Sequence, residues 1–102
     1  MSDRTPTSLP PRVEVQTESE TGRGWVYTVV VHHEGAVTEH AVSLAWCDHD
    51  YWSGGRMAPS RVVQVVVECA LRAAARDLPA RFDASTVRRW SRAMDTEIRG
   101  RL

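Results

Sequence analysis

Lysine is absent from this chain, whose thirteen basic residues are all arginine and are matched by thirteen acidic residues to give no net charge. A neutral chain lacks the overall positive charge that general nucleic-acid binding requires. No apolar run approaches the ~20 residues that span a bilayer, so the sequence predicts no membrane partner. With 102 residues the chain is long enough for one modest hydrophobic core and little more.

Cysteine is scarce as well, because Cys47 and Cys69 are the only two and stand far apart with no CxxC pairing. This arrangement provides no disulfide framework and is typical of a reducing compartment, so we expect a cytoplasmic protein. Residues 1–11 contain three prolines and no apolar centre, which does not fit a signal peptide. We therefore predict a flexible N-terminal arm over residues 1–11 and a single α+β domain over residues 12–102.

The zero net charge conceals two oppositely charged halves. Residues 1–60 contain four arginines and eight acidic residues, whereas residues 61–102 contain nine arginines and five acidic residues. The first half therefore carries −4 and the second carries +4. Such charges can orient two docking molecules, although each exposed ion pair contributes only about 0–1 kcal/mol.

Three segments of the first half have the composition of β-strands. Near the N-terminal end, Val13, Val15 and Thr17 alternate with polar residues, which is the period-two pattern of a half-buried strand. Residues 25–33 (WVYTVVVHH) and 36–46 (AVTEHAVSLAW) are rich in the β-branched and aromatic side chains that favour strands. The sequence therefore predicts three antiparallel strands in chain order.

The two residues between the second and third segments, Glu34 and Gly35, favour a tight hairpin because glycine tolerates the positive φ that such turns need. The turn fixes a register with these opposing pairs: His33 and Ala36, Val31 and Thr38, Val29 and His40, Tyr27 and Val42, Trp25 and Leu44. Those residues share one face, which has the larger apolar groups and is predicted to face the core. The other face carries Val26, Thr28, Val30, His32, Val37, Glu39, Ala41, Ser43 and Ala45.

The second half predicts two helices. Residues 57–77 place Pro59 at a favourable first helical position. A polar stripe recurs there at every fourth residue, at Gln64, Glu68, Arg72 and Arg76. The second helix, over about residues 85–99, can be capped by Asp83 or Ser85. Its predicted buried side consists of Val87, Trp90, Met94 and Ile98.

The order β-β-β-α-α predicts an α+β fold, a two-layer sandwich in which a three-stranded antiparallel meander is followed by two helices. A three-stranded sheet leaves two unpaired edges, and unpaired edges invite pairing with another chain. The outer face of the sheet mixes small apolar and polar groups, which is the composition of a non-obligate interface. We therefore expect a homodimer with two-fold symmetry.

Four stretches together resemble an uncharacterised family of short bacterial α/β proteins, namely EHAVSL, DHDYWSGG, the helix opened by Pro59 and LPARFDASTVRRW. Members of that family run from an H-x-V-x-L strand, through an Asp-containing turn with a glycine pair, into a proline-led helix. The resemblance covers about residues 38–98, and the chain departs from the pattern at Ala84, where the family has leucine. It implies a compact α/β domain in a bacterial protein and supplies no established activity.

The stretch WCDHDYWSGG, residues 46–55, concentrates the side chains capable of chemistry. With the inward-pointing His40, it supplies a possible functional loop whose members are His40, Cys47, Asp48, His49, Asp50, Tyr51 and Trp52. Four consecutive residues cannot all turn towards one ion, and zinc ligands pair at spacings such as CxxC, so we predict no metal and no cofactor. A thiolate–imidazole pair would need Cys47 within hydrogen-bond reach of a histidine, and no oxyanion-hole signature accompanies it.

We interpret the same stretch as the corner between the sheet and the first long helix. Asp48 or Asp50 is expected to cap the turn, while Tyr51 and Trp52 anchor it against the core. On this interpretation Cys47 fills space at a strand end and His49 is solvated. His40 is expected to be a core histidine, bonded either to a backbone carbonyl or to Tyr27.

The C-terminal region carries a possible basic patch formed by Arg88, Arg89, Arg92 and Arg99. Arginine suits phosphate recognition, but Asp95 and Glu97 dilute the patch. The predicted gap between the two helices also exceeds the short turn of a helix–turn–helix motif.

Three functions therefore remain open. We favour a protein-interaction or regulatory module that acts as a homodimer. The alternative is a nucleic-acid-associated accessory protein that uses the arginine-rich C-terminal helix. The third is a small enzyme with a site near residues 40–52, although the sequence favours a binding module over an enzyme.

Overall fold

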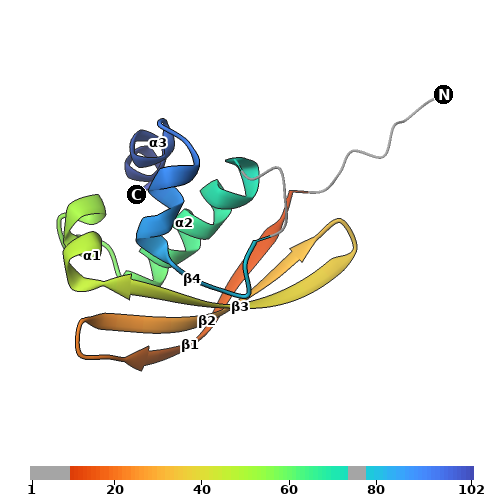
Figure 1. Ribbon diagram of the computed structural model, residues 1–102, viewed down its shortest axis with the longest axis horizontal. Coiled ribbons are helices and arrows are strands. Elements are labelled where there is room, and N and C mark those ends of the chain that lie inside the picture. The colour runs from red at the N-terminus through yellow and green to blue at the C-terminus, as the bar shows by residue number, and fades with distance from the viewer. Residues whose placement is uncertain (1–9, 74–77) are drawn as a thin grey trace.

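The computed structural model describes residues 10–73 and 78–102, and its sheet contains the three predicted strands (Figure 1). They are β1 (Arg12–Glu20), β2 (Gly24–His33) and β3 (Ala36–Ala45), joined as an antiparallel meander. A fourth strand, β4 (Arg81–Asp83), pairs in parallel with β3, which gives the order β1-β2-β3-β4. Most of the predicted arm, residues 1–11, lies outside the described residues.

The predicted β2–β3 hairpin is confirmed. Its turn has positive φ at both central residues, 53° at Glu34 and 80° at Gly35, and all five predicted residue pairs lie opposite one another. The predicted inner face is confirmed as well, because Tyr27, Val29 and Val42 are almost completely buried. The turn type therefore set the register, and the register decided which side chains enter the core.

β1 corrects one sequence-based prediction. A register shift between Val15 and Thr17 turns the rest of the strand over, so that Glu18 instead of Thr17 lies on the inner face, opposite Tyr27. The Tyr27 hydroxyl donates a 2.7 Å hydrogen bond to Oε1 of Glu18. Burial, that hydrogen bond and the negative charge of Glu18 all raise the pKa of Tyr27. A β-bulge of this kind adds one residue to one strand, and no alternation pattern announces it.

The helix α2 (Pro59–Ala73) covers the inner face of the sheet and begins at Pro59, as predicted. It also contacts the two C-terminal helical segments on its other side, so it is buried over most of its circumference. Its buried residues are Val62, Val63, Val65, Val66, Val67, Cys69 and Ala70. The valine-rich sequence is therefore helical because it is packed between two layers, although valine has only a modest helix propensity.

The structure has more helical segments than the sequence predicted. The stretch after β3 is itself a helix, α1 (Trp46–Ser53), so the prediction of a turn between the sheet and the long helix is wrong for these residues. The predicted single helix over 85–99 is divided into a 3₁₀ helix, η1 (Ala84–Trp90), and an α-helix, α3 (Met94–Arg101). Ser91 interrupts them because its backbone is extended, with φ −161° and ψ 141°. The predicted cap is confirmed, since Asp83 accepts a 3.0 Å hydrogen bond from the Ser85 N–H.

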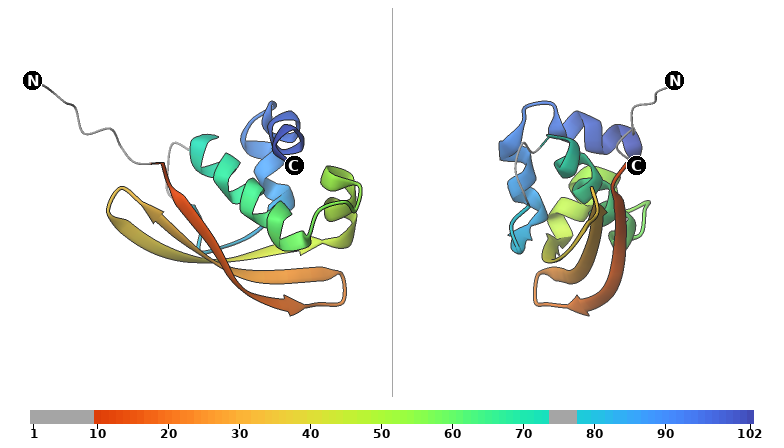
Figure 2. Two further views of the ribbon diagram at one scale, coloured as in Figure 1. Left: turned by 180° about the vertical axis from the view of Figure 1, so that it is seen from behind. Right: turned by 90° about the vertical axis from the view of Figure 1, so that its right-hand side faces the viewer.

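The helices of the described residues all pack on the same face of the sheet, which curls towards them, and none of them covers its other face (Figure 2). The architecture is therefore α+β, with a helical layer on a four-stranded mixed sheet. Within residues 10–73 and 78–102, no helix has the length and apolar character needed to cross a membrane.

Candidate functional site

α1 turns its chemistry-bearing residues in two opposite directions. Trp46, Cys47, Asp50 and Tyr51 are exposed, whereas the buried residues of the helix are Asp48, Trp52 and Ser53. The helix ends at Gly54, which has a left-handed backbone (φ 63°) and donates its N–H to the Asp50 carbonyl. Because Asp48 and Ser53 point inward while Trp46 and Tyr51 are exposed, α1 has no apolar stripe that sequence analysis could have recognised.

The buried side of α1 meets Arg88 of η1. The Arg88 guanidinium donates a 2.9 Å hydrogen bond to Oδ1 of Asp48, and its Nε lies 3.2 Å from Oδ1 of Asp95 on α3. The side chains of Arg88 and Asp48 are 31% and 12% exposed, so this ion pair is partly withdrawn from water. One arginine therefore connects α1 with the two C-terminal helical segments, η1 and α3.

Aromatic residues of α1 complete this arrangement. The Tyr51 hydroxyl and the Trp52 Nε1–H each donate to a different oxygen of Asp95, at 2.9 and 3.1 Å. The Arg88 guanidinium carbon lies 4.3 Å from the centre of the Tyr51 ring and 4.7 Å from that of Trp52. Cations at this distance from an aromatic ring are attracted by its electrons. We call these five residues, Asp48, Tyr51, Trp52, Arg88 and Asp95, the Arg88 cluster.

The charges in the Arg88 cluster stabilise one another. Burial would raise the pKa of Asp95, but the hydrogen bonds from Trp52 and Tyr51 and the positive charges of Arg88 and Arg99 hold it below its usual value. The Arg99 guanidinium carbon also lies 4.3 Å from the Tyr51 ring centre. Each carboxylate thus has donors, whereas the buried Arg88 Nε has only its ion-pair contact with Asp95 and no hydrogen bond to the described residues. The arrangement is a structural network with one buried donor left without a hydrogen-bond partner there.

The Arg88 cluster changes how both sequence-predicted sites are understood. It joins Asp48, Tyr51 and Trp52 of the possible functional loop to Arg88 of the possible basic patch, whereas Arg89 and Arg92 stay exposed outside it. The prediction that Asp48 or Asp50 caps the turn is wrong, because the Asp48 carboxylate pairs with Arg88 and the Asp50 side chain makes no hydrogen bond to the described residues. Asp95 was missed as a member, since no spacing in the sequence brings α1 and α3 together.

The remaining residues of the possible functional loop do not converge on one point. Cys47 is exposed at the start of α1, which corrects its prediction as a buried filler. His49 is not solvated as predicted, because its Nε2–H donates a 2.6 Å hydrogen bond to the Met57 carbonyl and its ring packs edge-on against Trp25. In the part of the chain that the structure describes, no hydrogen bond joins Cys47 to a histidine and no group of side chains is arranged to hold a metal ion.

His40 confirms one of its two predicted roles. Its ring is buried at 5% exposure, and its Nδ1–H donates a 2.6 Å hydrogen bond to the Pro79 carbonyl. Nε2 lies 2.8 Å from the Thr38 hydroxyl, which can donate to it. His40 therefore attaches the segment before β4 to β3 and has no free ring nitrogen for chemistry.

Asp83 performs a similar task at the end of β4. Ser43 donates a 2.6 Å hydrogen bond to its Oδ1, and the Ser85 backbone N–H donates to its Oδ2. Burial raises the pKa of Asp83, but these bonds, the Ser85 hydroxyl and the charge of Arg88 together lower it below the usual value. The Ser43–Asp83 contact was not predicted, because it depends on the fourth strand.

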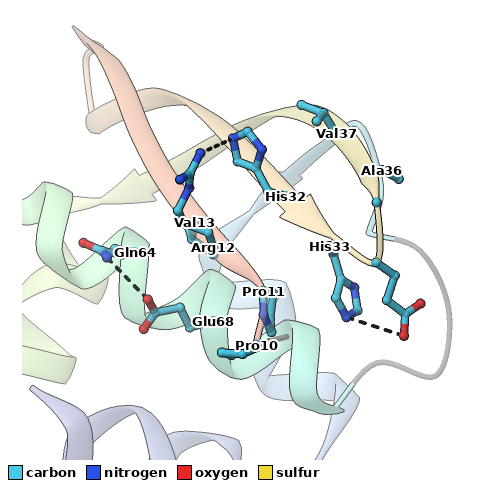
Figure 3. A pocket seen from close by; sticks show the side chains of 12 residues that line it. Pro10, Pro11, Arg12, Val13, His32, His33, Ala36, Val37, Gln64 and Glu68 are labelled. Carbon is cyan, nitrogen blue, oxygen red and sulfur yellow. Dashed lines mark hydrogen bonds and ion pairs between the residues drawn. The ribbon is translucent and has the colours of Figure 1, made fainter. Parts of the chain in front are cut away.

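A hollow of about 700 Å³ opens between the start of β1, the tip of the β2–β3 hairpin and α2 (Figure 3). Its polar groups are already engaged with neighbours: Arg12 lies 3.3 Å from His32 Nε2, and Gln64 donates a 3.3 Å hydrogen bond to Glu68. The other lining residues are Pro10, Pro11, Val13, His33, Glu34, Gly35, Ala36 and Val37. Positive, negative and apolar groups are mixed there, so the hollow does not define one class of ligand.

The sheet face that the sequence predicted to lie away from the core is the face that the described helices leave uncovered. Two neighbouring rows of residues cross its centre, as the strand register shows. The first, which we call the carboxylate rung, is Glu14, Val30 and Glu39; the second, the arginine rung, is Thr17, Thr28, Ala41 and Arg81.

Apolar side chains remain accessible to solvent across this face. Val37 is 63% exposed, and Val26, Val30, Ala41 and Ala45 are each partly exposed. An apolar surface rimmed by polar groups is typical of an interaction site.

The chain matches no protein-family model, and it has no significant similarity to a curated protein or to a solved structure.

Proposed function

We propose that the protein is an interaction or regulatory module that acts as a homodimer through its uncovered sheet face. The observation that carries this proposal is that every helix within residues 10–73 and 78–102 packs on the inner face of the sheet (Figure 2). The opposite face then exposes the partly apolar centre around Val30. A second copy that covered it would remove this apolar surface from water, which is the main favourable contribution to association.

The edges of the sheet are poorer candidates than its face. The outer edge of β1 is interrupted by the register shift after Val15 and carries the exposed Glu18 and Glu20, features that discourage another strand from pairing. The opposite edge, β4, has only three residues. The proposed contact therefore lies on the face of the sheet and not at its edges.

Sedimentation equilibrium at micromolar concentrations tests the proposed homodimer. We expect a mass that rises from monomer to dimer with concentration, and we expect Val30→Lys to weaken association by at least ~10-fold by placing a charge in the interface centre. Thr96→Lys is the matched control, since it adds the same charge at an exposed position of α3. A monomer mass that stays constant as salt and protein concentration vary would contradict the proposal.

The second candidate, binding of nucleic acid, is favoured by one observation. Arg89 and Arg92 are exposed, and no ion pair involves them among the described residues. Arg88 opposes it, because two carboxylates already share its charge. Salt-dependent retention on heparin that is lost in Arg89→Gln/Arg92→Gln would support this candidate, whereas elution with the unbound fraction at low salt would remove it.

We also propose a bacterial, cytoplasmic setting. The resemblance of residues 38–98 to short bacterial proteins supports the first part. The second part is supported by Cys47 and Cys69, which are both free thiols. Maleimide labelling in freshly lysed cells that produce the protein would test whether the Cys47 thiol is reduced. A Cys47 that does not react would count against a cytoplasmic location.

A further inference from the structure

Two exposed charges of opposite sign stand on neighbouring rows of the uncovered sheet face. Glu39 belongs to the carboxylate rung and Arg81 to the arginine rung. Arg81 shares the outer face with Ala41, its partner in the register, and the Ser43–Asp83 hydrogen bond two residues further on confirms which side this part of β4 presents. No ion pair within the described part of the chain involves either Glu39 or Arg81.

Glu14, the third charged residue of these two rows, already has partners within the chain. Glu14 lies 3.1 Å from an Arg12 guanidinium nitrogen and 3.5 Å from His32 Nε2. Glu39 and Arg81 are therefore the charges of these two rows that have no partner among the described residues and that a covering molecule would have to match.

We propose that a second copy of the chain covers the face about a two-fold axis perpendicular to the strands, with Glu39 of each copy against Arg81 of the other. This inference rests on the proposed homodimer and specifies how it is built. Face-to-face sheets pack either aligned, with their strands within about 30° of each other, or nearly at right angles, and the proposed dimer is of the aligned kind. The axis of an aligned pair therefore runs either along the strands or across them.

Charge excludes the first of these axes. An axis along the strands would place every row against the same row of the second copy, so that Glu14 and Glu39 of one copy would approach Glu39 and Glu14 of the other. Like charges brought together in an interface are strongly unfavourable.

For an axis across the strands, charge also selects which rows of the two copies lie over each other. If the axis passed through the carboxylate rung, Glu39 would meet Glu39, and if it passed through the arginine rung, Arg81 would meet Arg81. An axis between the two rungs places the carboxylate rung of each copy over the arginine rung of the other. Glu39 then lies over Ala41 and beside Arg81, twice per dimer, while Val30 packs against Thr28.

The face is large enough for a weak dimer. Three long strands about 4.8 Å apart and about 30 Å long give a projected area of roughly 430 Å² per copy, or roughly 860 Å² for the pair. That total lies a little below the ~1,000 Å² of a typical specific interface, so correct charge pairing has a large share in determining the affinity.

Charge exchange at the two positions tests this arrangement in the full-length protein. We expect Glu39→Arg and Arg81→Glu each to weaken dimerisation at least ~10-fold by sedimentation equilibrium, because each places like charges in contact. The double variant Glu39→Arg/Arg81→Glu should return to within ~3-fold of the original affinity, since it restores both pairs with reversed sign. Arg89→Glu, a reversal on the helical side, is the control and should leave the affinity unchanged.

The outcomes separate this inference from the proposed function. A monomeric original protein would remove the homodimer itself. A dimer whose affinity does not respond to the single reversals, or is not restored by the double one, would overturn the arrangement while the homodimer stands. If a charge variant fails to fold, disulfide trapping tests the arrangement instead. Chains with Val30→Cys and chains with Thr28→Cys, both in a Cys47→Ser background, are mixed and should form the mixed disulfide in preference to either homodisulfide. A preference for the homodisulfides overturns the inference.

Discussion

The two faces of β2 differ in environment far more than in composition. Tyr27, Val29 and Val31 point inward and are at most 2% exposed, whereas Val26 and Val30 point outward and stay partly exposed. Both faces carry β-branched valine, so intrinsic strand propensity cannot explain the difference. The helical layer on one side creates it. The inner face therefore holds most of the folding energy, and the outer face is available to a partner.

The adjacent valines Val29 and Val30 provide a direct test of this difference. We expect Val29→Ala to lower the free energy of unfolding by about 3 kcal/mol, because it leaves a cavity at a completely buried position. Val30→Ala should cost less than about 1 kcal/mol in the monomer. Urea unfolding of both variants at a concentration below dimerisation measures the contrast, and equal losses would mean that the outer face is already covered within one chain.

The Arg88 cluster holds the helical layer together, so its loss should weaken the inner side without touching the sheet. We expect Arg88→Met to cost about 2–3 kcal/mol, because the mostly buried Asp48 carboxylate loses its charged donor. Arg89→Met is the matched control at an exposed neighbouring position and should stay within about 0.5 kcal/mol. Thermal unfolding of the pair measures the difference, and a loss below 1 kcal/mol in Arg88→Met would show that the cluster is not a stabilising network.

Trp90 marks the border of the inner core. The sequence placed it on a fully buried helical stripe, but the structure leaves it partly exposed beside Phe82, with ring centres 6.0 Å apart. Trp90→Ala should therefore cost about 1–2 kcal/mol instead of the ~3–5 kcal/mol of a completely buried tryptophan. Chemical unfolding distinguishes the two ranges. A loss above 3 kcal/mol would restore the original prediction.

Local rules predicted the meander and failed where distant segments meet. The two-residue turn at Glu34–Gly35 determined the whole β2–β3 register, which is why alternation sufficed to assign both faces. Alternation could not reveal the bulge in β1, because one extra residue is invisible until its partner strand is known. The helix α1 was missed because polar groups face inward on it, where Arg88 satisfies them. β4 was missed because three residues give no periodic signal.

The smallest expected effect concerns Asp83, which joins β4 to the outer face through Ser43. Its pKa in the folded protein lies below the usual value, so the folded state binds protons less readily there than the unfolded state does. The resulting stabilisation is complete above the unfolded pKa of ~3.9 and is lost as the pH falls through the lower folded pKa.

Asp83→Asn should remove this contribution. The free energy of unfolding should then fall less between pH 7 and pH 3 in the variant than in the original protein. Because the carboxylate is partly exposed, we expect this difference to be well under ~1 kcal/mol. Asp50→Asn, an exposed aspartate of α1 whose side chain makes no hydrogen bond to the described residues, is the matched control. Urea unfolding at the two pH values measures the effect for both variants. An unchanged pH dependence in Asp83→Asn would mean that Ser43 and Ser85 hold the edge of the outer face equally well without the negative charge.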